Sequence, residues 1–295
     1  MSLPMNTAAT VTLSRQEWTG AIRRHEERAR QWIEPHLNRR SRGEKHPIWD
    51  FLFDYYAVRP SHVMRWHPGI GTTLIDAADA PHTRWRDYQL TADGTVSADV
   101  DAFLSHRRKD MEDLLHLLRA TDTNRVQFDC FGLHEWAMVY RQKEHRHPLP
   151  LRLGQTGTDA VVEQHDIKCT HFDAFRFFTP AAQPLNLTVL NNTSRPAHEQ
   201  AGCLHVGMDL FKWAAKMEPL VPGDLLLDAF ELARDIRLLD MEASPYDCRG
   251  IGYGVVPIET PEGKAEYVSR QRGFAQRARP LRNRLVAILE TVLGD

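Results

Sequence analysis

The segment Cys203-Leu-His-Val-Gly-Met-Asp-Leu-Phe-Lys-Trp213 places polar groups in an apolar run with helical spacing. His205 and Asp209 are separated by four residues in it, so on a helix they share one face. One helix can offer two ligands to a metal ion in this way. The alternative is a His–Asp hydrogen bond with Lys212 as counter-ion, and the spacing alone supports both interpretations equally.

Two earlier segments are built in the same way. They are Cys130-Phe-Gly-Leu-His-Glu-Trp-Ala-Met-Val-Tyr-Arg141 and Cys169-Thr-His-Phe-Asp-Ala-Phe-Arg-Phe-Phe178. In each, a histidine begins an aromatic-rich run and a cation follows, whereas a helix that only packs would carry Leu, Ile and Ala. Polar groups are costly to bury without partners. We therefore expect His134, His171 and His205 to converge, which makes residues 127–217 the candidate site region.

A metal is the simplest shared partner for these groups. Three histidines and a carboxylate from separate helices are typical of a first-row transition metal, with iron favoured over structural zinc. The predicted ligands are His134, His171, His205 and Asp209. The cysteines form no CxxC pair, which favours packing thiols over zinc ligands. A haem is the alternative cofactor, because one histidine among Phe and Trp suffices to bind it.

Other polar residues of the region are candidates for catalysis and substrate binding. Glu135 and Asp173 are the candidate catalytic carboxylates, although Thr170-x-x-Asp173 also matches a capping box, which would make Asp173 a helix-start residue. Position 138 is Met, so the zinc-protease motif HExxH is absent. The candidate substrate-binding residues are the cations Arg141, Arg176 and Lys212 and the aromatic residues Trp136 and Tyr140.

The rest of the chain predicts a mainly α protein. Hydrophobic spacing indicates long helices over 14–36, 99–121, 224–242 and 270–292, the first opened by the capping box Ser14-Arg-Gln-Glu17. Extended patterns predict small β-hairpins within 70–98 and 255–267, and a further extended stretch at 159–162. We expect residues 1–13 to be disordered. Residues 14–295 should form one bundle-like domain with β-hairpin insertions.

Composition narrows the class of protein. The 295 residues include 42% hydrophobic residues, enough for a core, and the formal net charge is −2. A DNA-binding protein usually shows a basic excess, which this chain lacks. No run of apolar residues approaches the roughly 20 needed to span a bilayer, and no signal peptide is recognisable. We expect a cytoplasmic protein with a small-molecule substrate and no membrane partner.

Four strings resemble a family, found largely in actinobacteria, that carries the label 3-methyladenine DNA glycosylase. The resemblance covers about residues 17 to 286 and is strongest in Lys45-His-Pro-x-x-Asp-Phe-Leu-Phe-x-Tyr-Tyr56, Phe131 to Arg141, His171 to Phe178 and Ala243-Ser-Pro-Tyr-Asp247. It implies release of alkylated bases from DNA, with Glu135 or Asp209 activating water. The Leu-Pro-Gly-Val-Gly hairpin of helix-hairpin-helix glycosylases is absent from the sequence.

Three functions follow from these observations. The residues favour a metal-dependent, oxidative enzyme acting on a small anionic substrate. The resemblance implies a DNA repair glycosylase, for which DNA would be the partner. A haem- or ligand-binding module without catalytic activity is the third.

Overall fold

The computed structural model describes residues 11–295. Over these residues the protein is 57% helical, with eleven α-helices and one small four-stranded sheet, which confirms the predicted mainly α class. The helices are α1 (Arg15–Ser41), α2 (Phe51–Tyr56), α3 (Pro60–Val63), α4 (Val100–Thr123), α5 (Leu133–Ala137), α6 (Gly154–Glu163), α7 (Phe172–Phe175), α8 (Arg195–His198), α9 (Leu204–Lys216), α10 (Gly223–Glu242) and α11 (Pro261–Leu293). Single 3₁₀ turns lie at Pro81–Arg84, Gln183–Leu185, Asn192–Ser194 and Arg249–Ile251.

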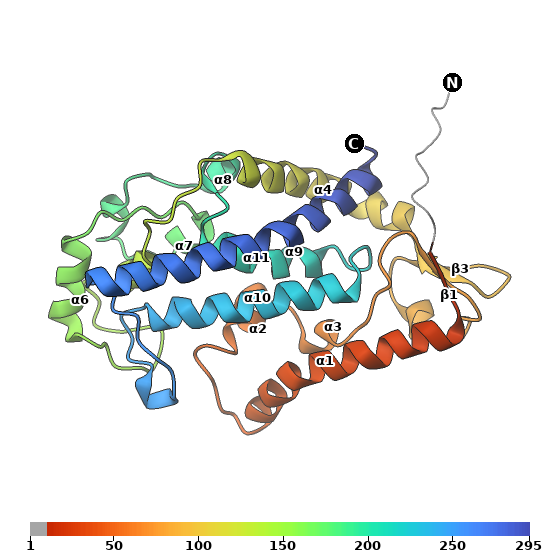
Figure 1. The fold of residues 1–295 in the computed structure, drawn as a ribbon, viewed down its shortest axis with the longest axis horizontal. Helices are drawn as coiled ribbons and strands as arrows, with labels where there is room; N and C mark the ends of the chain where they lie inside the picture. Colours follow the sequence, from red (N-terminus) through yellow and green to blue (C-terminus); the bar gives the residue numbers. More distant parts are fainter. Residues whose placement is uncertain (1–10) are drawn as a thin grey trace.

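The four long helices lie close to where hydrophobic spacing predicts them. Ser14 caps α1 through the predicted capping box with Glu17. The apolar face expected for α4, formed by its four leucines between 114 and 118, is buried. In Figure 1, α1, α10 and α11 run along the long axis of the molecule. Helices α10 and α11 pack on α9, and α4 packs on α8, so three of these helices contact the candidate site region.

Two segments predicted to be β do not form strands. The stretch 159–162 belongs to helix α6. Its two valines, Val161 and Val162, are on the buried face of that helix. The hairpin predicted within 255–267 is also wrong. The side chain of Thr260 accepts a hydrogen bond from the backbone N–H of Gly263, and Pro261 occupies the first turn, so helix α11 starts there.

The small sheet has the strand order β1 (Val11–Leu13), β2 (Thr72–Leu74), β4 (Val96–Ala98), β3 (Tyr88–Leu90). Strands β3 and β4 form the hairpin predicted within 70–98. Strand β1 corrects the prediction of disorder for its residues. It runs parallel to β2, where the N–H of Val11 donates to the carbonyl of Gly71 at 2.8 Å. Residues 1–10 of the expected disordered segment lie outside the described part of the chain.

The close packing of α9 on α10 positions the candidate site. A Cβ atom at Gly207 would lie only 2.8 Å from Cδ1 of Ile236, so a glycine here permits the close approach of the two helices. A continuous apolar core, formed by residues between Ala29 and Leu289 in the chain, surrounds this contact. Within residues 11–295, no helix combines the length and the apolar character that crossing a bilayer requires.

Candidate functional site

The three histidines predicted to converge lie together in the core. His134 is on α5, His171 is the N-cap of α7, and His205 is near the start of α9. The ring centroids of His134 and His205 are 4.4 Å apart, and those of His171 and His205 are 5.2 Å apart. At most 6% of each residue's surface is exposed. Segments distant in the sequence therefore build one row of imidazoles, with His205 in the middle.

The row carries one group of possible ligands at each end. Atoms of His134, His205 and Asp240 all lie within 4.8 Å of one another, and so do atoms of His171, Asp173 and Asp209. The predicted set of three histidines with Asp209 is therefore divided between two groups. The carboxylate next to His134 is Asp240 of α10, whose Oδ1 accepts a hydrogen bond from Nε2 of His134 at 2.8 Å.

Asp240 is a site residue that is not among the candidates predicted from the sequence. It is fully buried, and so is Arg237 one turn before it on α10. Nη1 of Arg237 donates to Asp240 at 2.5 Å and to Glu135 at 2.8 Å. An Arg-x-x-Asp pair on the buried face of a helix is the sequence signal that identifies such a residue, because charges are rarely buried without partners.

Electrostatics distinguish the histidines at this end. Burial disfavours the charged form of His134, but the carboxylate of Asp240 outweighs burial and raises the pKa of His134. Burial would likewise raise the pKa of Asp240, yet His134 and Arg237 hold it below its ordinary value. Burial and then the neighbouring His134 keep the pKa of His205 well below the usual range. His205 is therefore neutral at pH 7, the form in which imidazole binds metals.

The other end of the row already contains a cation. Nε2 of His171 donates to Oδ2 of Asp209 at 3.3 Å, while Nδ1 of His171 accepts from the N–H of Ala174 at 3.3 Å. Nζ of Lys212 lies 2.6 Å from the same Asp209 oxygen and 3.4 Å from Asp173. The structure therefore has the His–Asp hydrogen bond with Lys212 as counter-ion that the sequence allowed as the alternative at Asp209. It also shows that His171, not Thr170, caps α7.

The remaining predicted residues have partners of their own. The carboxylate of Glu135 is buried against Arg237 at 2.8 Å. Nε1 of the buried Trp136 donates to the carbonyl of Ala243 at 2.9 Å. The Arg141 guanidinium and the Tyr140 hydroxyl both bind Glu163, and Arg176 lies 3.5 Å from Asp173, with about half of its side chain exposed.

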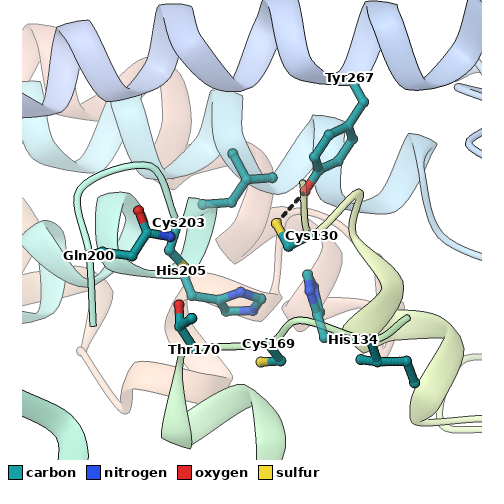
Figure 2. A pocket seen from close by; sticks show the side chains of 10 residues that line it. Cys130, His134, Cys169, Thr170, Gln200, Cys203, His205 and Tyr267 are labelled. Carbon is teal, nitrogen blue, oxygen red and sulfur yellow. Dashed lines mark hydrogen bonds between the residues drawn. The ribbon is translucent and has the colours of Figure 1, made fainter. Parts of the chain in front are cut away.

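A small cavity lies beside His134 and His205. Its volume is about 10 Å³, which is about the space that one water molecule requires. Figure 2 shows the two imidazoles at the cavity, with the hydroxyl of Tyr267 directed from α11 toward Cys130. The other lining residues are Ile167, Cys169, Thr170, Gln200, Cys203 and Leu204. Burial raises the pKa of all three lining cysteines, that of Cys169 to about 12, so they are thiols at pH 7.

A wider cleft of about 800 Å³ adjoins the cavity. Cys169, Thr170 and Gln200 line both spaces. The cleft also carries the cations Arg125, Lys168 and Arg272, against the single carboxylate of Asp129. Asp129 is bound by Lys168 at 2.7 Å, so two positive charges are left without a carboxylate partner among the lining residues. A small anion could therefore bind next to the histidines.

Comparison with protein-family models, with curated proteins and with solved structures finds no match for this chain.

Proposed function

We propose that this protein is a metal-dependent enzyme in which His134, His205 and Asp240 hold the ion and the adjoining cleft binds a small anionic substrate. The observation that carries the proposal is the position of three ligand atoms within 4.8 Å around a buried point. Two ligand atoms bound at right angles about 2.1 Å from one ion are about 3 Å apart. The 2.8 Å between His134 and Asp240 fits such a pair.

His205 supplies a second argument. Its ring makes no hydrogen bond to any residue between 11 and 295, although only 4% of the residue is exposed. Because the ring lines the small cavity, a water molecule or an ion there can bind its unprotonated nitrogen. The cavity has room for about one water molecule, and an ion of similar size would meet the neutral imidazole there.

Two imidazoles and one carboxylate are the ligand set that non-haem iron(II) oxygenases use, with positions left open for reactants. This chemistry supports iron as the metal and oxidation of the substrate as the reaction. Arg237 would hold the Asp240 carboxylate in place through Oδ2, the oxygen that His134 does not contact, as metal-binding carboxylates generally require. The charge of the cleft favours a carboxylate- or phosphate-bearing substrate.

The test begins with protein purified without an affinity tag, loaded anaerobically with iron(II) and passed over a desalting column. We expect a single iron per chain in the wild type and in His116→Ala, which alters an exposed histidine of α4. His205→Ala should retain less than about a tenth of that iron, because one of the three ligands is lost. Equal iron retention in His205→Ala would contradict the proposed site.

Activity is measured separately with the loaded protein. Dioxygen consumption is followed with a panel of small carboxylates and phosphate esters. The proposal predicts consumption that depends on one class of anion and is weakened in Arg272→Gln, which removes a cation of the cleft. Iron bound at the site without dioxygen consumption on any anion would contradict the oxidative reaction.

A further inference from the structure

A second cleft, of about 500 Å³, lies beyond the other end of the histidine row. We call it the Lys216 cleft, and its volume is within the usual range for small-molecule sites. Its Arg and Lys side chains are Arg59, Arg65, Arg86, Arg107, Lys212 and Lys216, and its only carboxylates are Asp87 and Glu218. Arg107 and Lys212 are paired with carboxylates outside the lining, Asp110 and Asp209, but the cleft still carries an excess of positive charge.

The two carboxylates are already engaged by histidines. Oδ1 of Asp87 lies 3.0 Å from Nε2 of His106, and Oε2 of Glu218 lies 3.1 Å from Nδ1 of His62. The nearest permanent cation to Asp87 is Arg86, at 3.6 Å. The acidic groups of the cleft therefore neutralise little of the charge on its Arg and Lys side chains.

Three cations of the cleft have no carboxylate within 4.0 Å. Within the described part of the chain this holds for Arg59, Arg65 and Lys216, whereas Lys212 is paired with Asp209. The side chain of Lys216 is largely exposed, but the partial burial of its ammonium lowers its pKa, and the positive neighbours Lys212 and Arg107 lower that pKa further. Like charges held together without counter-ions are unfavourable unless an anion binds between them.

We propose that the Lys216 cleft binds a small phosphate-bearing metabolite. A phosphate offers several acceptor oxygens to a cluster of Arg and Lys donors, which a single carboxylate does not. The cleft is also lined by the aromatic side chains of Tyr56, Trp85 and Phe103, and the guanidinium of Arg65 lies 5.2 Å from the ring centroid of Trp85. These rings provide apolar surface for the organic part of the ligand.

The phosphate site would also be linked to the histidine row through hydrogen bonds. Lys212 lines the cleft, and its ammonium binds Asp209, which accepts a hydrogen bond from His171. The Lys216 cleft is separate from the 800 Å³ cleft beside His134, because the two share no lining residue. This second site therefore does not depend on the proposed metal or on its substrate.

The test uses full-length protein treated with a chelator, so that no metal ion is bound at the histidine site during the titration. Pyrophosphate is titrated calorimetrically, with citrate as a polycarboxylate control. We expect saturable binding of pyrophosphate that is at least about tenfold tighter than that of citrate. Lys216→Gln, at an exposed position, should weaken pyrophosphate binding about tenfold, as should Arg65→Gln if its unfolding temperature is unchanged.

Lys143→Gln, which removes an exposed cation that lines neither cleft, is the matched control and should bind pyrophosphate like the wild type. Three results would overturn the proposal. They are no saturable binding of pyrophosphate at millimolar concentration, unchanged binding in Lys216→Gln, and a loss of binding in Arg272→Gln, in the 800 Å³ cleft, but not in Lys216→Gln. Tighter binding of a short DNA duplex than of pyrophosphate would overturn it as well, because the cleft would then be part of a nucleic-acid surface.

Discussion

Nε2 of His134 lies 2.8 Å from Oδ1 of Asp240, although 106 residues separate the two in the sequence. This contact joins the short helix α5 to the long helix α10 inside the core. Arg237 binds Asp240 from another side and also binds Glu135, the neighbour of His134. The position of His134 is therefore fixed by a buried network of ion pairs and hydrogen bonds, as a preorganised ligand site requires.

Removing the centre of this network should destabilise the protein strongly. Arg237→Leu leaves the buried carboxylates of Glu135 and Asp240 without their cation. Loss of one partner from a buried ion pair costs about 3–5 kcal/mol, and we expect a fall of this size in the free energy of unfolding measured with urea.

The control for Arg237→Leu is Lys109→Ala, which breaks the exposed ion pair of Lys109 with Asp113 on α4. Solvent screens this pair, so no measurable change in stability is expected. An Arg237→Leu protein that unfolds at the same urea concentration as Lys109→Ala would show that the network does not stabilise the core.

Stability should also depend on pH through His82. This residue is fully buried, and its Nε2 donates to the carbonyl of Trp66 at 2.9 Å. Burial lowers the pKa of His82 from 6.5 to about 4. Between these values the unfolded chain binds a proton that the folded protein excludes. The contribution of His82 is therefore complete above pH 6.5 and is lost as the pH falls toward 4, by about 3 kcal/mol in total.

The measurement is urea unfolding at several pH values from 7 to 4.5, for the wild type and for His82→Gln. The variant should lose less stability over this range, because glutamine does not titrate. Burial is the largest cause of the lowered pKa of the neighbouring His67 and the charge of His82 is the second, so the larger part of the His67 contribution is common to both proteins. Parallel curves for the two proteins would disprove the assignment to His82.

The resemblance to proteins labelled 3-methyladenine DNA glycosylase leads to a separate prediction. We expect purified protein to release no 3-methyladenine from methylated DNA above background. The carboxylates that would activate water are buried and bound to cations, Glu135 to Arg237 and Asp209 to Lys212. Clear release that is abolished by Glu135→Gln would establish glycosylase activity and remove the basis for an oxidative enzyme.

Sequence patterns predicted the parts of this structure that depend on local spacing. The periodic leucines of α4 and α10 placed those helices within two residues of their observed ends. The start of α11 was missed because Pro261-Glu-Gly resembles a turn, whereas Pro261 follows the capping residue Thr260. Strand β1 was missed because it forms only through pairing with β2, which lies some 60 residues later.

In the candidate site, too, one part was predictable from the sequence and another part depends on the packing of distant helices. The meeting of His134, His171 and His205 was predictable, since three buried imidazoles need shared partners. The choice of carboxylate was not, because it depends on how α10 is rotated toward α5. That rotation directs Asp240 to His134, while Asp209 is directed to Lys212.

The central claim is that one metal ion binds between His134, His205 and Asp240. The most direct test is a crystal of the iron-loaded protein, with diffraction data collected on both sides of the iron absorption edge. The anomalous difference map should contain a peak about 2.0–2.2 Å from a ring nitrogen of each histidine and from an oxygen of Asp240. A peak at another position, or the unchanged 2.8 Å contact of His134 with Asp240 and no peak, would contradict the claim.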